Sequence, residues 1–140
     1  MRKTTIVAAL VAALAAGPAF ADAYKDGIAA GNSGDFVTAL KLLTPLAEKG
    51  DARAQFAVGQ VYHRGLGEID EDPTKARHWY EKAARQGNAN AQSNLGVIYA
   101  TGDGVPQDDR IAEKWFRLAA DQGNQDAKDN LAVIMRRRLN

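Results

Sequence analysis

The segment AQSNLGVIYATGDGVPQDDRIAEKWFRLAADQGN, residues 91–124, concentrates residue types that phosphate, metal and ligand-stacking sites use. A Walker loop needs Lys-Ser or Lys-Thr after its last glycine, and a dinucleotide-binding loop needs a third glycine and a preceding strand. Neither Gly102-Asp103-Gly104 nor the similar Gly65-Leu66-Gly67 has these features. We therefore predict that both are tight turns between helices, with glycine at positive φ.

Acidic and histidine side chains are the candidates for a metal site. The acidic candidates are Asp103, Asp108, Asp109 and Glu113. They lack the spacing of an EF-hand loop, and Asp108 or Asp109 is better explained as a helix N-cap. The only histidines, His63 and His78, lie 15 residues apart in a chain without Cys, so a zinc site would have to recruit carboxylates. We predict no metal and no cofactor, with both histidines facing a partner or solvent.

Nucleophilic chemistry has little support in the sequence. Ser33 and Ser93 are the only serines, and neither stands in a Ser-x-x-Lys or Gly-x-Ser-x-Gly motif. We therefore predict no catalytic residue and a protein that is not an enzyme.

The segment AQFAVGQVYHRGLGEIDEDPTKARHWYEKAARQGN, residues 54–88, repeats most of this pattern. The offset is 37 residues up to the second turn glycine and 36 residues beyond it. A pattern that recurs with such a period is typical of a helical solenoid. Trp79-Tyr80 and Trp115-Phe116 recur in step, which favours packing between successive repeats over the alternative of stacking on a ligand.

The first 21 residues have the pattern of a secretory signal peptide. Arg2 and Lys3 precede an apolar run over 6–16, and Ala19-Phe20-Ala21 forms a small-x-small cleavage site. The apolar run is too short to span a bilayer, and without Cys there is no site for lipid attachment behind the signal. We expect cleavage after Ala21 and a periplasmic or secreted protein, with a signal of bacterial style.

Charge argues against a nucleic-acid partner. The whole chain has a formal net charge of +1 from 18 basic and 17 acidic residues, and loss of Arg2 and Lys3 leaves 16 basic residues. Nucleic-acid binding needs a strong local excess of basic residues. The single basic run, Arg136-Arg137-Arg138, is better explained as complementing the dipole at the end of a helix.

Each repeat divides into two helical patterns. In residues 52–88, Ala54, Val58, Val61 and Tyr62 share one face, and Asp72-Pro73 starts a second helix that ends near Gly87. Gly59, beside the first face, lets a neighbouring helix approach closely. Residues 89–124 repeat the pair. We predict about seven helices in all, organised as a first repeat at 22–51, repeats at 52–88 and 89–124, and a C-terminal capping helix within 125–140.

The flanking helices fit the same scheme. Residues 24–32 are expected to form a short first helix, and residues 35–49 a second one with a kink at Pro45. The expected apolar face of 35–49 is Ala39, Leu42, Leu43 and Leu46. In the capping helix, expected at 126–138, the repeat positions are Leu131, Ile134 and Met135.

The two full repeats resemble the Sel-1-like repeat family, whose pattern is Ala-x3-Leu-Gly-x2-Tyr-x2-Gly-x-Gly-Val followed by Ala-x2-Trp-Tyr-x2-Ala-Ala-x2-Gly. The matching residues in the later repeat are Ala91, Leu95, Gly96, Tyr99, Gly102, Gly104, Val105, Ala112, Trp115, Phe116, Ala119, Ala120 and Gly123. The earlier repeat has Val58 for Leu and Glu68 for Val. The opening segment is more similar to the related tetratricopeptide repeat, through Gly27, Gly34-Asp35-Phe36 and Ala39.

This resemblance implies an all-α, right-handed α-α solenoid that binds a protein or peptide partner as a non-enzymatic interaction module. Some cysteine-rich secreted members of the family are linked to penicillin binding, and this chain lacks their cysteines. The absence of these cysteines weakens the link, and an enzyme acting on a β-lactam or cell-wall substrate is kept as the alternative. A purely structural subunit is a third possibility.

By resemblance to the tetratricopeptide arrangement, the first helices line a concave binding face. The implied partner-binding positions are Tyr24, Ile28, Phe56, Gln60, His63, Ser93, Val97, Asp129, Val133 and Arg136. This face is expected to be apolar and aromatic at its N-terminal end and charged at its C-terminal end.

The turn interpretation makes a prediction about Gly104. If this residue has positive φ, Gly104→Val should lower the free energy of unfolding by more than about 1 kcal/mol, because a β-branched side chain clashes there. The loss should occur without any ligand and is measured by thermal unfolding. An unchanged melting temperature would contradict the turn assignment.

Overall fold

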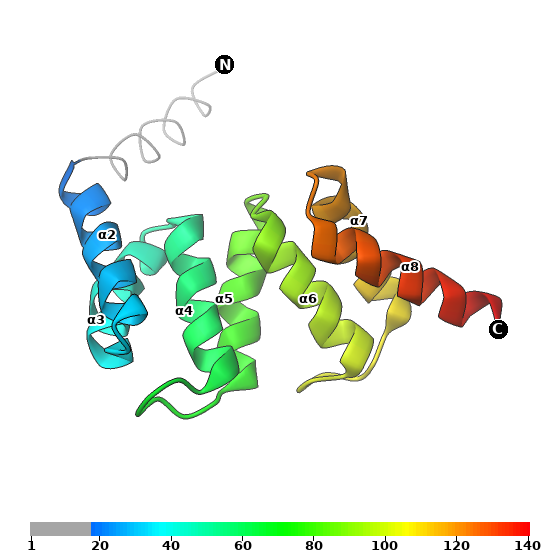
Figure 1. Ribbon diagram of the computed structural model, residues 1–140, viewed down its shortest axis with the longest axis horizontal. Coiled ribbons are helices and arrows are strands. Elements are labelled where there is room, and N and C mark those ends of the chain that lie inside the picture. Colours follow the sequence, from blue (N-terminus) through cyan, green and yellow to red (C-terminus); the bar gives the residue numbers. More distant parts are fainter. Residues whose placement is uncertain (1–17) are drawn as a thin grey trace, which may run out of the picture.

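The computed structural model describes residues 18–140, which form seven α-helices and contain no strand. The helices are α2 (Pro18–Asn32), α3 (Phe36–Glu48), α4 (Ala52–Arg64), α5 (Pro73–Arg85), α6 (Ala89–Thr101), α7 (Asp109–Asp121) and α8 (Gln125–Leu139). They stand in a row, each packed mainly against its neighbours in sequence (Figure 1). The predicted all-α solenoid of three helix pairs and a terminal helix is confirmed.

Asp and Asn side chains fix where the helices begin. Each helix from α3 to α8 starts behind one of them, and the caps are Asp35, Asp51, Asp72, Asn88, Asp108 and Asn124. Asp108 accepts hydrogen bonds from the backbone N–H groups of Arg110 at 2.9 Å and Ile111 at 3.1 Å. Such a cap contributes about 1 kcal/mol. The acidic residues after the glycine turn therefore include the cap of α7.

The glycine turns end α4 and α6 as predicted. The C-cap residues Gly65 and Gly102 have φ of 56° and 75°, and the second turn glycines are also left-handed, with φ of 67° at Gly104. A Cβ atom built on Gly104 would lie 3.1 Å from Cβ of Pro73, the first residue of α5. The turn of one repeat therefore packs closely against the second helix of the repeat before it.

An aromatic ring of each second helix lies on a glycine of the first helix. A Cβ atom at Gly59 would lie 2.7 Å from the Tyr80 ring, and one at Gly96 would lie 2.4 Å from the Phe116 ring. Both rings are 1% exposed. The expected close approach at Gly59 is confirmed, and it lets α4 and α5, or α6 and α7, pack as tight pairs.

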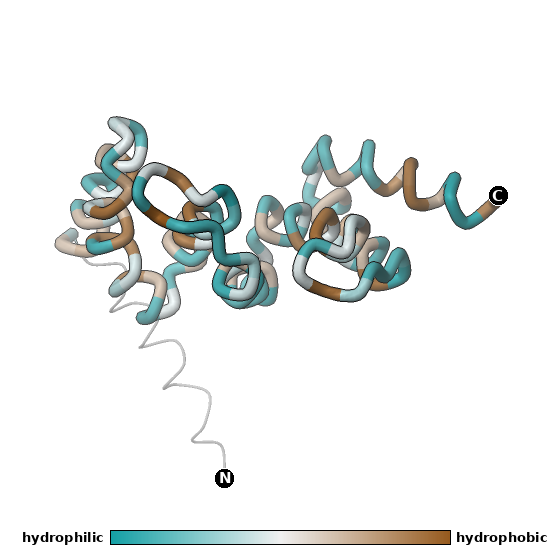
Figure 2. Tube along the Cα trace, turned by 90° about the horizontal axis from the view of Figure 1, so that it is seen from below, coloured by the Kyte–Doolittle hydropathy of each residue, from teal (hydrophilic) through white to brown (hydrophobic). Residues whose placement is uncertain are grey.

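The core runs along the array as three adjoining clusters. Trp79 and Trp115 are half-buried, and each packs against the cluster that its own first helix shares with the preceding repeat. This arrangement confirms the prediction that the tryptophans pack between successive repeats. Figure 2 shows the same row of helices from below, with α8 leading to the C-terminus.

Two details of the flanking helices differ from expectation. α2 extends over Pro18–Asn32 and so includes residues before the expected start near Tyr24. On α3, Leu40 and Ala47 are buried whereas Leu42 is half-buried, so the apolar face is turned further than predicted. Pro45 lies inside α3, where the kink stays a prediction.

In the terminal helix α8, Ile134 is buried, whereas Met135 is 45% exposed. Most of the expected signal peptide lies outside the described residues. Its expected cleavage site after Ala21 falls within α2, where the neighbouring Phe20 packs against the first cluster.

Buried glutamines form a clamp at the junction of successive repeats, which the sequence reading did not anticipate. Gln92, 4% exposed, donates through Nε2 to the carbonyl of Ala84 at 3.1 Å, and its Oε1 accepts from Nε2 of Gln122 at 2.9 Å. Three helix ends, those of α5, α6 and α7, are joined in this way. Gln55 and Gln86 make the same contacts one repeat earlier, at 3.0 and 2.9 Å.

The clamp predicts a specific instability. Gln92→Ala removes two hydrogen bonds of a buried side chain, one to the Ala84 carbonyl, which also accepts from the Gly87 N–H at 3.0 Å, and one from the exposed Gln122 amide. At about 0.5–1.5 kcal/mol for each lost hydrogen bond, the expected loss of stability is about 1–3 kcal/mol. Urea unfolding should report that loss. The matched control is Gln125→Ala, whose exposed side chain bonds only Asp129 on the surface, and which should change stability by less than about 0.5 kcal/mol. Equal stability of the two variants would contradict a stabilising role for the clamp.

Candidate interaction groove

Successive first helices, α2, α4, α6 and α8, are separated by three pockets. We call them the apolar pocket, between α2 and α4 with a volume of about 410 Å³, the amide pocket, between α4 and α6 with about 450 Å³, and the small pocket, between α6 and α8 with about 90 Å³. Gln60 and Arg64 line both the apolar and the amide pocket, and Val97 lines the small one. The pockets therefore follow one another along a single face of the array.

The expected binding residues are distributed unequally over these pockets. Phe56, Gln60, His63 and Ser93 line the amide pocket, and Ile28 lines the apolar pocket with Gln60. Val97 and Val133 line the small pocket. Ser93 is only 6% exposed, so it forms part of a wall and presents little surface.

The remaining three expected residues, Tyr24, Asp129 and Arg136, line none of these three pockets. The Tyr24 ring is covered by the Arg53 guanidinium, 4.3 Å from the ring centroid. Asp129 accepts a hydrogen bond from Gln125 at 2.9 Å, and Arg136 is exposed. Asp129 and Arg136 therefore lie apart from these pockets, whereas the neighbouring Arg137 lines the small one.

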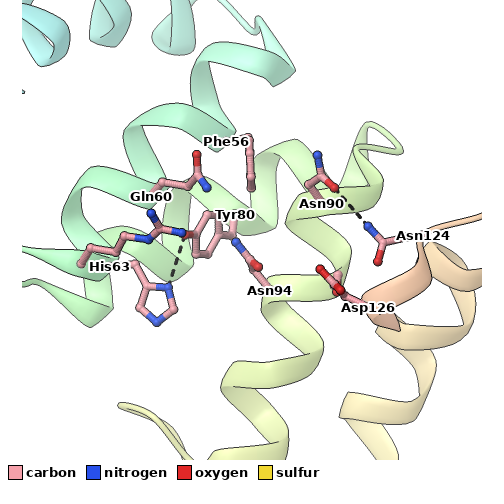
Figure 3. Close-up of a pocket in the computed structure, with 10 residues that line it drawn as sticks. Phe56, Gln60, His63, Tyr80, Asn90, Asn94, Asn124 and Asp126 are labelled. Atoms are coloured by element: carbon pink, nitrogen blue, oxygen red, sulfur yellow. Dashed lines mark hydrogen bonds between the residues drawn. The ribbon is translucent and has the colours of Figure 1, made fainter. Parts of the chain in front are cut away.

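Several pocket residues were missed by the sequence reading. They are Arg64, Tyr80, Asn90, Asn94, Asn124 and Asp126 in the amide pocket (Figure 3). A register comparison contains the signal for part of this set, because Gln60-x3-Arg64, Val97-x3-Thr101 and Val133-x3-Arg137 occupy the same repeat positions and all line pockets. The pocket-lining positions thus extend the expected stripe by one further position on each first helix.

Tyr80 lies at the centre of the amide pocket although it belongs to a second helix. Its ring centroid is 5.9 Å from that of Phe56 and 5.7 Å from that of His63, which it meets edge-on. Its hydroxyl is 3.4 Å from Nδ1 of His63, and Asn94 reaches toward it from α6 (Figure 3). Burial raises the pKa of Tyr80 to about 12, against the smaller opposing effects of the Asn94 hydrogen bond and the Arg64 charge.

Polar contacts between repeats hold the pocket walls in place. Nε2 of His63 lies 3.2 Å from Oδ2 of Asp103, the acidic residue of the next repeat's glycine turn. On the opposite side, Nδ2 of Asn124 donates to Oδ1 of Asn90 at 3.0 Å. Asp103, His63 and Tyr80 thus form a connected chain, and the Gly-Asp-Gly turn contributes to the pocket through its aspartate.

The Asp-His-Tyr chain is arranged for hydrogen bonding. With a pKa of about 12, the Tyr80 phenol stays protonated near neutral pH and is a poor nucleophile. Between residues 18 and 140, no three His, Asp or Glu side chains gather closely enough to hold a metal ion. The same part of the chain has no helix that is both long and apolar enough to cross a membrane.

A row of antiparallel helix pairs with pockets along one face defines a helical-repeat protein. A family model described as the Sel1 repeat matches residues 12–51, 52–88 and 89–124, and the chain belongs to this family. Proteins of this family act as protein-interaction scaffolds. The first match ends where the expected first repeat ends and begins ten residues before it.

Solved structures share the fold, and one curated relative is similar in sequence. The crystal structure of a Sel1 repeat protein from Oxalobacter formigenes is 36% identical with a TM-score of 0.71, covering 79% of this chain and 85% of that one. A protective antigen of uropathogenic Escherichia coli with an SLR fold is 36% identical with a TM-score of 0.70, covering 74% and 22%. A component of an Arabidopsis thaliana ERAD-associated ubiquitin ligase, HRD3A, is 41% identical over 64 residues, which are 46% of this chain and only 9% of that protein.

The pKa of Tyr80 predicts how stability depends on pH. The native state keeps the phenol proton up to about pH 12, whereas the unfolded chain loses it near pH 10. The stability that the buried, protonated phenol contributes is therefore complete below pH 10 and is lost as pH rises toward 12. Between these values, the free energy of unfolding should fall by about 2 kcal/mol more for the wild type than for Tyr80→Phe, measured by urea unfolding. Parallel profiles for the two proteins would show that Tyr80 is not held as a buried phenol.

Proposed function

We propose that this protein is a non-enzymatic interaction module that binds an extended segment of a partner protein along the groove formed by the three pockets. The observation that carries the proposal is the row of pockets between successive first helices, in which Gln60 and Arg64 join one pocket to the next. Sel1 repeats mediate protein interactions in general, and helical solenoids use such extended surfaces for binding.

The groove suits a peptide better than a compact small molecule. Its pockets lie between the four first helices α2, α4, α6 and α8 and differ in chemistry. Ile28 and Leu43 make one pocket apolar, and Asn90 and Asn94 make the next one polar. An extended chain advances about 3.3 Å per residue and its alternate side chains share one face, so side chains two or more residues apart can enter successive pockets. Phe56 supplies aromatic surface of the kind that often dominates such interfaces, and the buried Tyr80 ring supports it from below.

The location belongs to the proposal as well. The basic start, the apolar run and Ala19-Phe20-Ala21 favour export to the bacterial envelope or beyond the cell. Cell fractionation with N-terminal sequencing tests this, and the expected first residue of the exported protein is Asp22. Hydrolysis of a chromogenic β-lactam by the pure protein would overturn the non-enzymatic part of the proposal.

The groove makes a prediction about Phe56. Photo-crosslinking from position 60 in an envelope extract identifies the partner, and binding of that partner is then measured with purified variants. Phe56→Ala should weaken binding by about 1–3 kcal/mol because it removes a half-buried aromatic anchor from the amide pocket. Circular dichroism checks that the variant folds.

The matched control is Lys82→Ala on α5. Lys82 is exposed, its amino group lies 5.1 Å from the centroid of Trp79, and it lines none of the three pockets. Its replacement should leave affinity nearly unchanged. If Lys82→Ala abolishes binding while folded Phe56→Ala binds normally, the opposite face of the array is the binding surface.

A further inference from the structure

We propose that the partner segment carries a large apolar residue followed or preceded, two or four positions away, by an acidic side chain. This inference rests on the proposed function and specifies the chemistry of the segment that the groove accepts. It follows from the apolar pocket, the unpaired arginine at its border and the amides beyond it.

The apolar pocket is suited to one large aliphatic or aromatic side chain. Ile28, Phe36 and Leu43 contribute its apolar walls, and its volume is about 410 Å³. Gly27 and Gly31 of α2 also line it, and neither places a side chain in the space between α2 and α4. Burying a large apolar side chain of the partner would be favourable by about 1.5–3 kcal/mol.

Arg64 supplies a positive charge at the border between the apolar and amide pockets. It lines both and is exposed, and among residues 18–140 no carboxylate lies within ion-pair distance of it. Asp103 is engaged by His63, and Asp126 lies on the α8 side of the amide pocket. The border is therefore positively charged and complementary to a carboxylate, which an arginine can bind through two hydrogen bonds.

The amide pocket offers hydrogen bonds for a main chain. The carbonyl of Asn90 is taken by Asn124, which leaves its amide hydrogens as donors. Asn94 donates to Tyr80, which leaves its carbonyl as an acceptor. Asn90 and Asn94 lie one turn apart on α6, so together they can satisfy a carbonyl and an N–H of a peptide passing between them.

The spacing follows from the geometry of an extended chain. Arg64 lines the apolar pocket as well as the amide pocket, so the acidic side chain must leave the segment on the same face as the apolar one. Side chains share a face at every second residue, about 6.6 Å apart. A side chain seated in the apolar pocket therefore places the residue two or four positions away beside Arg64, and the next residues beside the asparagines of α6. The carboxylate is that of an Asp or Glu side chain, because the segment continues past Arg64 into the amide pocket.

A peptide library tests this with the full chain from Asp22. The probe is a phage-displayed library of random peptides held at both ends, so that no chain-end carboxylate is available. The wild type should enrich peptides with a large apolar residue and an acidic residue two or four positions apart. Arg64→Glu should weaken the best such peptide about tenfold and should instead enrich peptides with Lys or Arg at the acidic position.

Arg85→Glu is the matched control, since Arg85 is an exposed arginine in the last turn of α5 and lines none of the three pockets. It should keep the wild-type preference, with affinity changed less than twofold. Enriched peptides without the acidic residue, or an unchanged preference in folded Arg64→Glu, would overturn this inference and leave the proposed function standing. If no peptide is enriched by the wild type, both fail.

Discussion

The packing of one aromatic ring on one glycine determines most of this structure. Tyr80 on Gly59 and Phe116 on Gly96 bring the two helices of a repeat into close contact, and the missing side chain on the glycine is what makes room for the ring. A buried ring of this size contributes several kcal/mol, which is a large part of a small domain's stability. The helix pairs that result are the units from which the groove is built.

The same contact gives the amide pocket its polar centre. Because Tyr80 reaches from the second helix beneath Gly59, its hydroxyl arrives at the opposite face beside His63. Phe116 takes the equivalent path and brings no hydroxyl to the small pocket that it lines. The two pockets therefore differ in this hydroxyl as well as in the side chains of their first helices, such as His63 in one and Ala100 in the other. Core packing and the candidate groove depend on the same residue.

Polar side chains set how one repeat sits on the next. The glutamine clamp joins three helix ends at each of two junctions, and His63 contacts Asp103 across the second. These contacts orient the first helices relative to one another. At α8 the position of Gln92 is taken by exposed Lys128, so the clamp does not recur at this helix. The groove therefore depends on contacts that lie mostly outside it.

The sequence by itself determined the fold: the 37- and 36-residue offsets, the Asp and Asn caps and the turn glycines are local signals, and each fixed a helix, a turn or a repeat boundary. It also placed four predicted residues in one pocket, since helical periodicity sets which residues share a face. Only the tertiary structure decided which residues of the first helices line open pockets and that Tyr80 joins them from a second helix. It also decided that Arg53 covers Tyr24. These outcomes depend on the angles between neighbouring helices, which long-range packing sets and no single repeat encodes.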